Sequence, residues 1–232
     1  MVTIQIRQLD IPPGQRLRLH DISWQEFEAI LEELGEHRSA RLAYIEGTLE
    51  IAMPLPEHEV DKELIGDMVK IWLEELEIDC ECFGSTTFKQ QQKKGGVEPD
   101  QCFYIKNHQA MRGKRRVDLT VDPPPDLAIE IDVTSKTQLS AYAALQVPEL
   151  WRYENNHLQI NIWQGGKYVE SQNSLIFPGW AIADLIAEFV GQSVILGRSP
   201  ALRAFRQRVR QENIIDTPRS KDAGFLRTNF GG

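Results

Sequence analysis

The sequence is poor in cysteine and has no long apolar run, and each shortage excludes a class of protein. Its three cysteines, Cys80, Cys82 and Cys102, cannot all pair with one another, and Cys80-Glu81-Cys82 has the wrong spacing for a structural zinc knuckle. No apolar run approaches the roughly 20 residues that are needed to cross a bilayer. We therefore expect reduced cysteines and no membrane span.

Several short motifs are also missing. The start of the chain, residues 1–7, lacks the charged and then apolar segments of a secretory signal, which favours a cytoplasmic location. There is no GxxxxGK[ST] phosphate loop, so a nucleotide-driven motor is not expected. There is no GxSxG motif either, which argues against a serine nucleophile of the hydrolase type.

What is present is an ordinary globular composition, with 232 residues, 41% of them apolar and 26% charged. This length suits one domain, which we place at residues 1–212 and which includes an N-terminal extension. Residues 213–232 lose periodicity, and we expect them to form a disordered tail. The formal charge of −8 argues against a protein coated in positive charge for nonspecific nucleic-acid binding.

The charges are unevenly distributed along the chain. Residues 21–81 hold 18 acidic and 4 basic side chains, whereas residues 89–116 hold 8 basic side chains against only two acidic ones, Glu98 and Asp100. Cations around an acidic site draw in a polyanion that the carboxylates alone would repel. This pattern indicates a nucleic-acid contact, and a lysine-rich surface hairpin is the alternative. The proposed contact residues are Lys93, Lys94, Arg115 and Arg116.

Hydrophobic periodicity predicts a mixture of helices and strands. Helices are expected after the Ser23 capping box as far as Gly35, at 57–77, 136–146 and 183–190, and from Ser199-Pro200 onward. Strands are expected at 79–89, 97–105 and 126–134, with hairpins at 41–53 and 149–163. We therefore predict an α/β (α+β) fold. Its central sheet is mixed and flanked by helices, with an extra N-terminal helix and hairpin and extra C-terminal helices.

The strand predicted at 126–134 carries two carboxylates, Glu130 and Asp132, two residues apart. Successive side chains on a strand point to opposite faces, so these two acids share one face and the apolar residues fill the other. Carboxylates there are costly to desolvate unless they are paired or bind a cation. Because Asp100 lies near the start of the preceding predicted strand, the three acids suggest a site for a divalent metal.

Three motifs follow one another along the chain: Glu98-Pro99-Asp100, then residues 126–135 (DLAIEIDVTS), then residues 147–151 (VPELW). In this order, and together with Ile45-Glu46-Gly47 and Glu57-His58, they resemble the Uma family of endonucleases. That family belongs to the restriction-endonuclease-like, or PD-(D/E)XK, superfamily. The resemblance covers about residues 20 to 195, and it implies a restriction-endonuclease-like core.

The resemblance also implies a chemistry, which is hydrolysis of phosphodiester bonds in nucleic acid, with DNA the expected substrate. Asp100 and Glu130 would be the two signature acids and would hold Mg²⁺ or Mn²⁺, which polarises the phosphate and lowers the pKa of a bound water. A homodimer is plausible because a duplex has two strands to cut.

In one place the sequence departs from the superfamily pattern. The position two residues after the second acid, where the signature has lysine, is Asp132. Lys136 is the nearest replacement, and Asp132 would then be a third metal ligand or would pair with Lys136. Glu46 and His58 are accessory candidates, although a turn acid and a solvated or helix-capping histidine are the more common explanations.

Two alternatives to an active nuclease remain open. One is a binding or regulatory protein that keeps a nuclease scaffold without turnover. A third hypothesis is a homo-oligomeric domain whose carboxylates form structural ion pairs with arginine or lysine.

Overall fold

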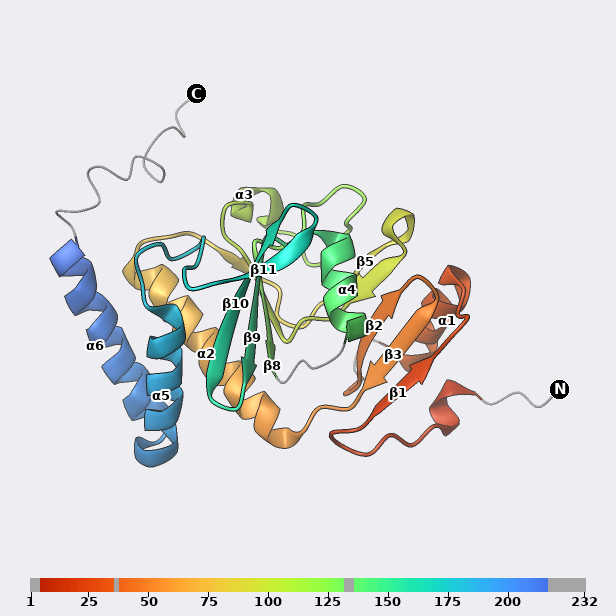
Figure 1. Ribbon diagram of the computed structural model, residues 1–232, viewed down its shortest axis with the longest axis horizontal. Helices are drawn as coiled ribbons and strands as arrows, with labels where there is room; N and C mark the ends of the chain where they lie inside the picture. Colours follow the sequence, from red (N-terminus) through yellow and green to blue (C-terminus); the bar gives the residue numbers. More distant parts are fainter. Residues whose placement is uncertain (1–4, 36–37, 132–135, 217–232) are drawn as a thin grey trace, which may run out of the picture.

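The computed structural model describes residues 5–35, 38–131 and 136–216, and in these ranges it contains two β-sheets and six α-helices (Figure 1). The predicted mixed α/β class is therefore confirmed. Two short 3₁₀-helices, η1 (Ile6–Gln8) and η2 (Gln91–Lys93), complete the elements that are not strands. The helices are α1 (Trp24–Leu34), α2 (Pro56–Glu75), α3 (His108–Met111), α4 (Lys136–Leu145), α5 (Ile182–Leu196) and α6 (Arg198–Asp216).

A five-stranded antiparallel sheet is formed by the N-terminal part of the chain. Its order is β1 (Arg16–Leu19), β3 (Thr48–Ala52), β2 (Arg41–Ile45), β6 (Gly95–Val97) and β5 (Phe88–Gln90). The predicted hairpin turns at Glu46 and Gly47, whose φ angles of 46° and 88° suit a tight turn between twisted strands. Helix α1 covers this sheet, with the Phe27 ring stacked on Tyr44 at 4.6 Å between ring centres.

The second sheet has six strands. Their order is β11 (Lys167–Ser171), β10 (His157–Gln164), β9 (Glu149–Glu154), β8 (Leu127–Ile131), β7 (Gln101–Tyr104) and β4 (Glu81–Cys82). Strands β8 and β9 run parallel and are connected through α4, whereas the other pairs are antiparallel. The predicted hairpin at 149–163 is confirmed, with Asn155 and Asn156 in the left-handed conformation at its turn.

Two of the predicted strands were wrong in a specific way. Residues 79–89 and 97–105 were each expected to form one strand, but each segment is divided between the two sheets, as β4 and β5 and as β6 and β7. The second break falls at Glu98-Pro99-Asp100. Pro99 has no N–H to donate, which disfavours a continuous central strand there. The chain therefore passes from one sheet to the other at the first predicted acid.

The helices lie on both faces of the six-stranded sheet (Figure 1). Helices α2, α5 and α6 share one hydrophobic core with it, whereas α4 packs on its other face and contacts β2 and β6 of the five-stranded sheet. Along β8, Leu127, Ile129 and Ile131 enter the first core, so Glu130 points to the α4 side. The strand alternation predicted for this segment is therefore confirmed as far as residue 131.

The C-terminal helix is longer than the sequence indicates. Helix α6 ends at Asp216, so the domain boundary expected at residue 212 falls inside a helix. The rest of the predicted tail, 217–232, lies outside the described residues. Among the described residues, no helix combines the length and the apolar character that a membrane span requires.

Candidate active site

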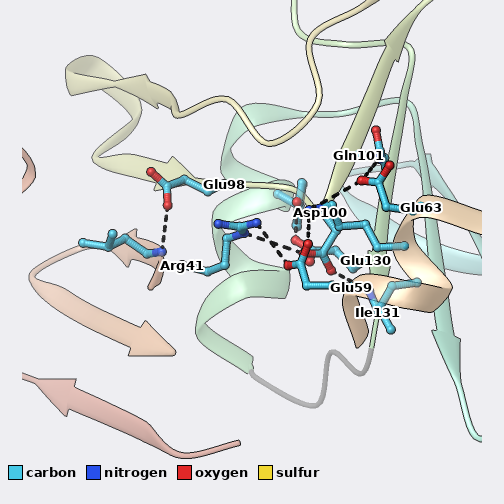
Figure 2. Close-up of polar contacts among 11 residues, drawn as sticks. Arg41, Glu59, Glu63, Glu98, Asp100, Gln101, Glu130 and Ile131 are labelled. Atoms are coloured by element: carbon cyan, nitrogen blue, oxygen red, sulfur yellow. Dashed lines mark hydrogen bonds and ion pairs between the residues drawn. The ribbon is translucent and has the colours of Figure 1, made fainter. Parts of the chain in front are cut away.

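Asp100 and Glu130 come together at the junction of the two sheets. The antiparallel register of β7 and β8 pairs Gln101 with Ile129, so Asp100, one residue before β7, lies beside Glu130 (Figure 2). Both side chains are buried, and the two residues are only 8% and 2% exposed. The sequence prediction that these carboxyl groups converge therefore agrees with the geometry.

Each carboxyl group has a defined set of partners. Asp100 Oδ2 accepts a hydrogen bond from the backbone N–H of Ile131 at 2.9 Å. Glu130 Oε1 accepts one from the hydroxyl of Tyr142 on α4. A backbone N–H of β8 and a hydroxyl of α4 therefore hold the two carboxyl groups in orientation.

The pKa values of both acids are displaced in the same direction. Burial raises the pKa of Glu130 well above its ordinary value, and the nearby charge of Asp100 raises it further. Burial also raises the pKa of Asp100, although the Ile131 N–H and the positive charges of Arg41 and Lys62 act against this rise. A bound cation would oppose both shifts, because its charge favours the ionised carboxylates.

A cavity of about 60 Å³ opens onto this acid pair. It receives residues from both sheets, from the start of α2 and from α4. His58, proposed as an accessory residue, is part of the lining. The full set comprises Gly14, Gln15, Arg16, Arg41, Ala52, Met53, Pro54, His58, Asp100, Glu130, Ile131 and Gln138.

Cationic side chains approach the acids from the five-stranded sheet and from α2. Arg41 Nε lies 3.7 Å from Asp100 Oδ1, and an Arg41 Nη atom lies 3.5 Å from Glu59 Oε1 (Figure 2). Lys62 Nζ lies 2.6 Å from Glu59 Oε2 and 3.9 Å from Glu63 Oε1. Acidic residues on the first turns of α2 therefore hold the two cations beside the buried pair.

Glu98, the other acid of the first motif, has a structural role. Its carboxylate accepts hydrogen bonds from Leu42 N at 3.1 Å, from Thr87 Oγ1 at 2.6 Å and from Arg38. Because these donors occupy both of its oxygens, Glu98 anchors the crossing segment to the five-stranded sheet. Asp126 is similar, because it accepts from the backbone N–H groups of Ile105 and Asn107 at 2.7 and 3.0 Å.

A divalent metal fits the chemistry of the acid pair. Carboxylate oxygens are the ligands that Mg²⁺ and Mn²⁺ prefer, and two of them share one cavity here. No group of three His, Cys, Asp or Glu side chains meets at a metal-binding distance within the part of the chain that the structure describes. Asp132, the third proposed ligand, lies outside the described residues. Lys136 is the first residue of α4, and its side chain also lies outside them.

The other proposed residues with described side chains do not line this cavity. Glu46 occupies the β2–β3 turn, where its N–H donates to the carbonyl of Lys94 at 3.0 Å, and neither residue lines the cavity. Lys93 is partly buried, and Lys94, Arg115 and Arg116 are exposed. The two segments that carry these cations are connected where Gln90 Nε2 donates to the carbonyl of Leu119 at 3.1 Å.

Sequence reasoning did not identify the contribution of Arg41, Gln138 and Tyr142 to this site. Arg41 begins a strand of the other sheet, and nothing local to it indicates a contact with Asp100. Tyr142 and Gln138 lie four residues apart on α4, which is the spacing of one helical face. This spacing of Gln138 and Tyr142, on a helix that follows the acidic strand, is the sequence signal that could have indicated their place in the site.

The family comparison agrees with the sequence motifs. The family model Uma2, described as "Putative restriction endonuclease", matches residues 24–188. A crystal structure described as a "putative nuclease belonging to DUF820 from Anabaena variabilis" is similar, with 17% identity and a TM-score of 0.46, over 69% of this chain and 90% of that one. The comparison with curated proteins found no match. Because the family model covers well over half of the sequence, the chain belongs to the Uma2 family.

Proposed function

We propose that the protein is a metal-dependent nuclease that hydrolyses phosphodiester bonds in nucleic acid, with Asp100 and Glu130 as its metal ligands. The observation that carries this proposal is the pair of buried carboxyl groups that share one cavity. A structural acid pair would gain nothing from such burial, because each carboxyl group is costly to ionise there. Membership of the Uma2 family supports the same activity.

Each part of the site has a role in this hydrolysis. When Mg²⁺ or Mn²⁺ is bound, it polarises the scissile phosphate and lowers the pKa of a water molecule. Asp100 and Glu130 hold the ion from adjacent strands, with Asp132 as a third ligand. The Ile131 N–H and the Tyr142 hydroxyl fix the two carboxyl groups in orientation.

The finer features of the proposal concern the substrate. We take DNA as the substrate and a homodimer as the active form, because both strands of a duplex must be cut. Lys93, Lys94, Arg115 and Arg116 then contact the phosphate backbone, and Lys136 contributes positive charge at the site. Replacing two of the four surface cations would weaken DNA binding and reduce its dependence on salt concentration.

The test is cleavage of a supercoiled plasmid in Mg²⁺ or Mn²⁺ by the purified protein and its variants. Asp100→Asn and Glu130→Ala should each lose cleavage while keeping the cooperative unfolding of the wild type. Asp184→Asn, a change on the exposed surface of α5, should cleave normally. Normal cleavage by the Asp100 or Glu130 variant would contradict the assignment.

A second function is favoured by one observation, which is that the two acids are almost inaccessible. A scaffold of this kind can bind nucleic acid without turnover. The same assay separates the two functions. A binding module shifts the plasmid in a gel in a salt-dependent manner, and it yields no nicked or linear product in either metal.

A further inference from the structure

We propose that Arg41 is the residue that binds the scissile phosphate in this site and neutralises the charge that develops on it during hydrolysis. This inference rests on the proposed nuclease function and extends it to a residue outside the acidic motifs. Arg41 belongs to β2 of the five-stranded sheet, whereas the acids lie at the edge of β7 and on β8 of the six-stranded sheet.

The position of Arg41 is the first argument. Its side chain is 15% exposed, lines the cavity and has a charged contact with Asp100. Strand β2 pairs with β3 on one side and with β6 on the other, so its backbone is held on both edges. A guanidinium group carried by such a strand is well positioned for a ligand that enters between the two sheets.

The contacts of Arg41 are the second argument. Its distances to Asp100 and Glu59, 3.7 and 3.5 Å, are longer than a charged hydrogen bond of about 2.7–2.9 Å. The buried Nε atom donates no hydrogen bond to the described residues. Lys62, in contrast, is held by Glu59 at 2.6 Å. Arg41 therefore has donors available beside the acids, whereas the Lys62 ammonium is already engaged.

The chemistry of the group is the third argument. A guanidinium is planar and offers paired N–H donors that match two non-bridging oxygens of a phosphate. Preorganised donors aimed at developing charge contribute strongly to catalysis, because no reorganisation is needed during the reaction. The position two residues after Glu130 is an aspartate, so the second acidic strand adds no positive charge there. Arg41 provides that charge from the opposite sheet.

The test compares Arg41→Ala and Arg41→Lys with Arg18→Met. Arg18 is a half-exposed arginine on β1 of the same sheet, pairs with Glu50 and does not line the cavity. Plasmid cleavage in Mn²⁺ gives kcat, calorimetry gives the Mn²⁺ affinity, and thermal unfolding gives Tm. Removing one such donor group lowers kcat by about 10²–10³-fold.

We expect Arg41→Ala to lose kcat to that extent while its Mn²⁺ affinity is unchanged or tighter, because a cation beside the metal site has been removed. Added guanidinium chloride, at concentrations too low to unfold the protein, should restore part of the rate of Arg41→Ala and none of that of Asp100→Asn. Arg41→Lys should keep more activity than Arg41→Ala, and Arg18→Met should keep the kcat and the Mn²⁺ affinity of the wild type.

Two results would overturn the role of Arg41 alone. One is normal cleavage by Arg41→Ala. The other is a loss of rate that guanidinium does not rescue and that is accompanied by weaker Mn²⁺ binding and a lower Tm, which would mark a structural residue. A wild-type protein that binds Mn²⁺ and cleaves neither plasmid, single-stranded DNA nor RNA would overturn the nuclease proposal itself, and this role with it.

Discussion

Replacing Glu130 with glutamine should stabilise the metal-free protein at neutral pH. In the structure Glu130 is buried beside Asp100 and accepts a hydrogen bond from Tyr142. The glutamine amide has the same shape as a protonated carboxyl group. Its oxygen accepts the Tyr142 hydrogen bond, and its NH₂ group takes the place of the O–H. It differs in that it cannot ionise.

The size of the effect depends on pH. Burial raises the pKa of Glu130 well above its ordinary 4.5. Stability from a carboxyl group of this kind is complete below its unfolded-state pKa and is lost as the pH rises through the folded-state pKa. Within that interval the wild type loses about 1.4 kcal/mol of unfolding free energy per pH unit relative to Glu130→Gln. For a chain of this size, each such unit corresponds to about 3–6 °C in Tm.

The measurement is thermal unfolding of both proteins in EDTA between pH 5 and 8.5. The difference in Tm should be smallest at pH 5 and should grow with pH in favour of Glu130→Gln. Excess Mn²⁺ should reverse the order, because a ligand present at 100 times its Kd stabilises the wild type by about 2.7 kcal/mol. If Glu130→Gln unfolds below the wild type in EDTA at pH 8, ionisation of Glu130 does not destabilise the metal-free protein and this reasoning is wrong.

A matched control is available in the neighbouring strand. Glu149 on β9 is also fully buried, but its two oxygens accept hydrogen bonds from Trp151 Nε1 at 2.6 Å and from Leu175 N at 2.7 Å. Glutamine there would direct its NH₂ group against an N–H donor. Glu149→Gln should therefore lose about 1–3 kcal/mol of unfolding free energy. A higher unfolding free energy for Glu130→Gln and a lower one for Glu149→Gln would show that the effect depends on hydrogen-bond partners and not on burial alone.

Two further substitutions test the packing around the site by thermal unfolding. Tyr142→Phe removes the hydroxyl that donates a hydrogen bond to Glu130, and it should lower the unfolding free energy by about 1 kcal/mol. An unchanged unfolding free energy would contradict this hydrogen bond. Gly96→Ala places a methyl group 2.9 Å from Cζ of the buried Phe27, so it should cost about 1–3 kcal/mol. Its control, Gly191→Ala, meets nothing within 4 Å on helix α5 and should instead gain about 1 kcal/mol; the same sign at both glycines would refute this reasoning.

The sequence predicts best what is local. The capping box at Ser23 and Glu26, the Glu46-Gly47 turn and the Asn155-Asn156 turn all occur where they were predicted, since each depends on a few consecutive residues. The convergence of Asp100 and Glu130 was also predictable, because adjacent strands that carry acids bring them together. Their roles as metal ligands stay a prediction.

What the sequence does not predict depends on distant pairing. Whether Phe88–Gln90 continues from β4 or pairs with Gly95–Val97 is decided by which sheet offers a free edge, and no local pattern records that choice. Helix α5 continues six residues beyond its predicted end at Val190, and its last turn exposes Val194, Ile195 and Leu196. The end was predicted where the regular spacing of apolar residues stops, and the exposed last turn lies beyond that point.

The location of the acid pair follows from how the crossing segment is anchored. Glu98 and Asp100 flank Pro99 and are held by different sheets. Glu98 accepts hydrogen bonds from Leu42 N and Thr87 on the side of the five-stranded sheet, whereas Asp100 accepts one from Ile131 of the six-stranded sheet. The distance between Arg41 and Asp100 is consequently set by the packing of one sheet against the other. The three-residue motif therefore determines where Glu98 and Asp100 occur in the sequence. Which cation faces Asp100 depends on the whole fold, because Arg41 belongs to the other sheet.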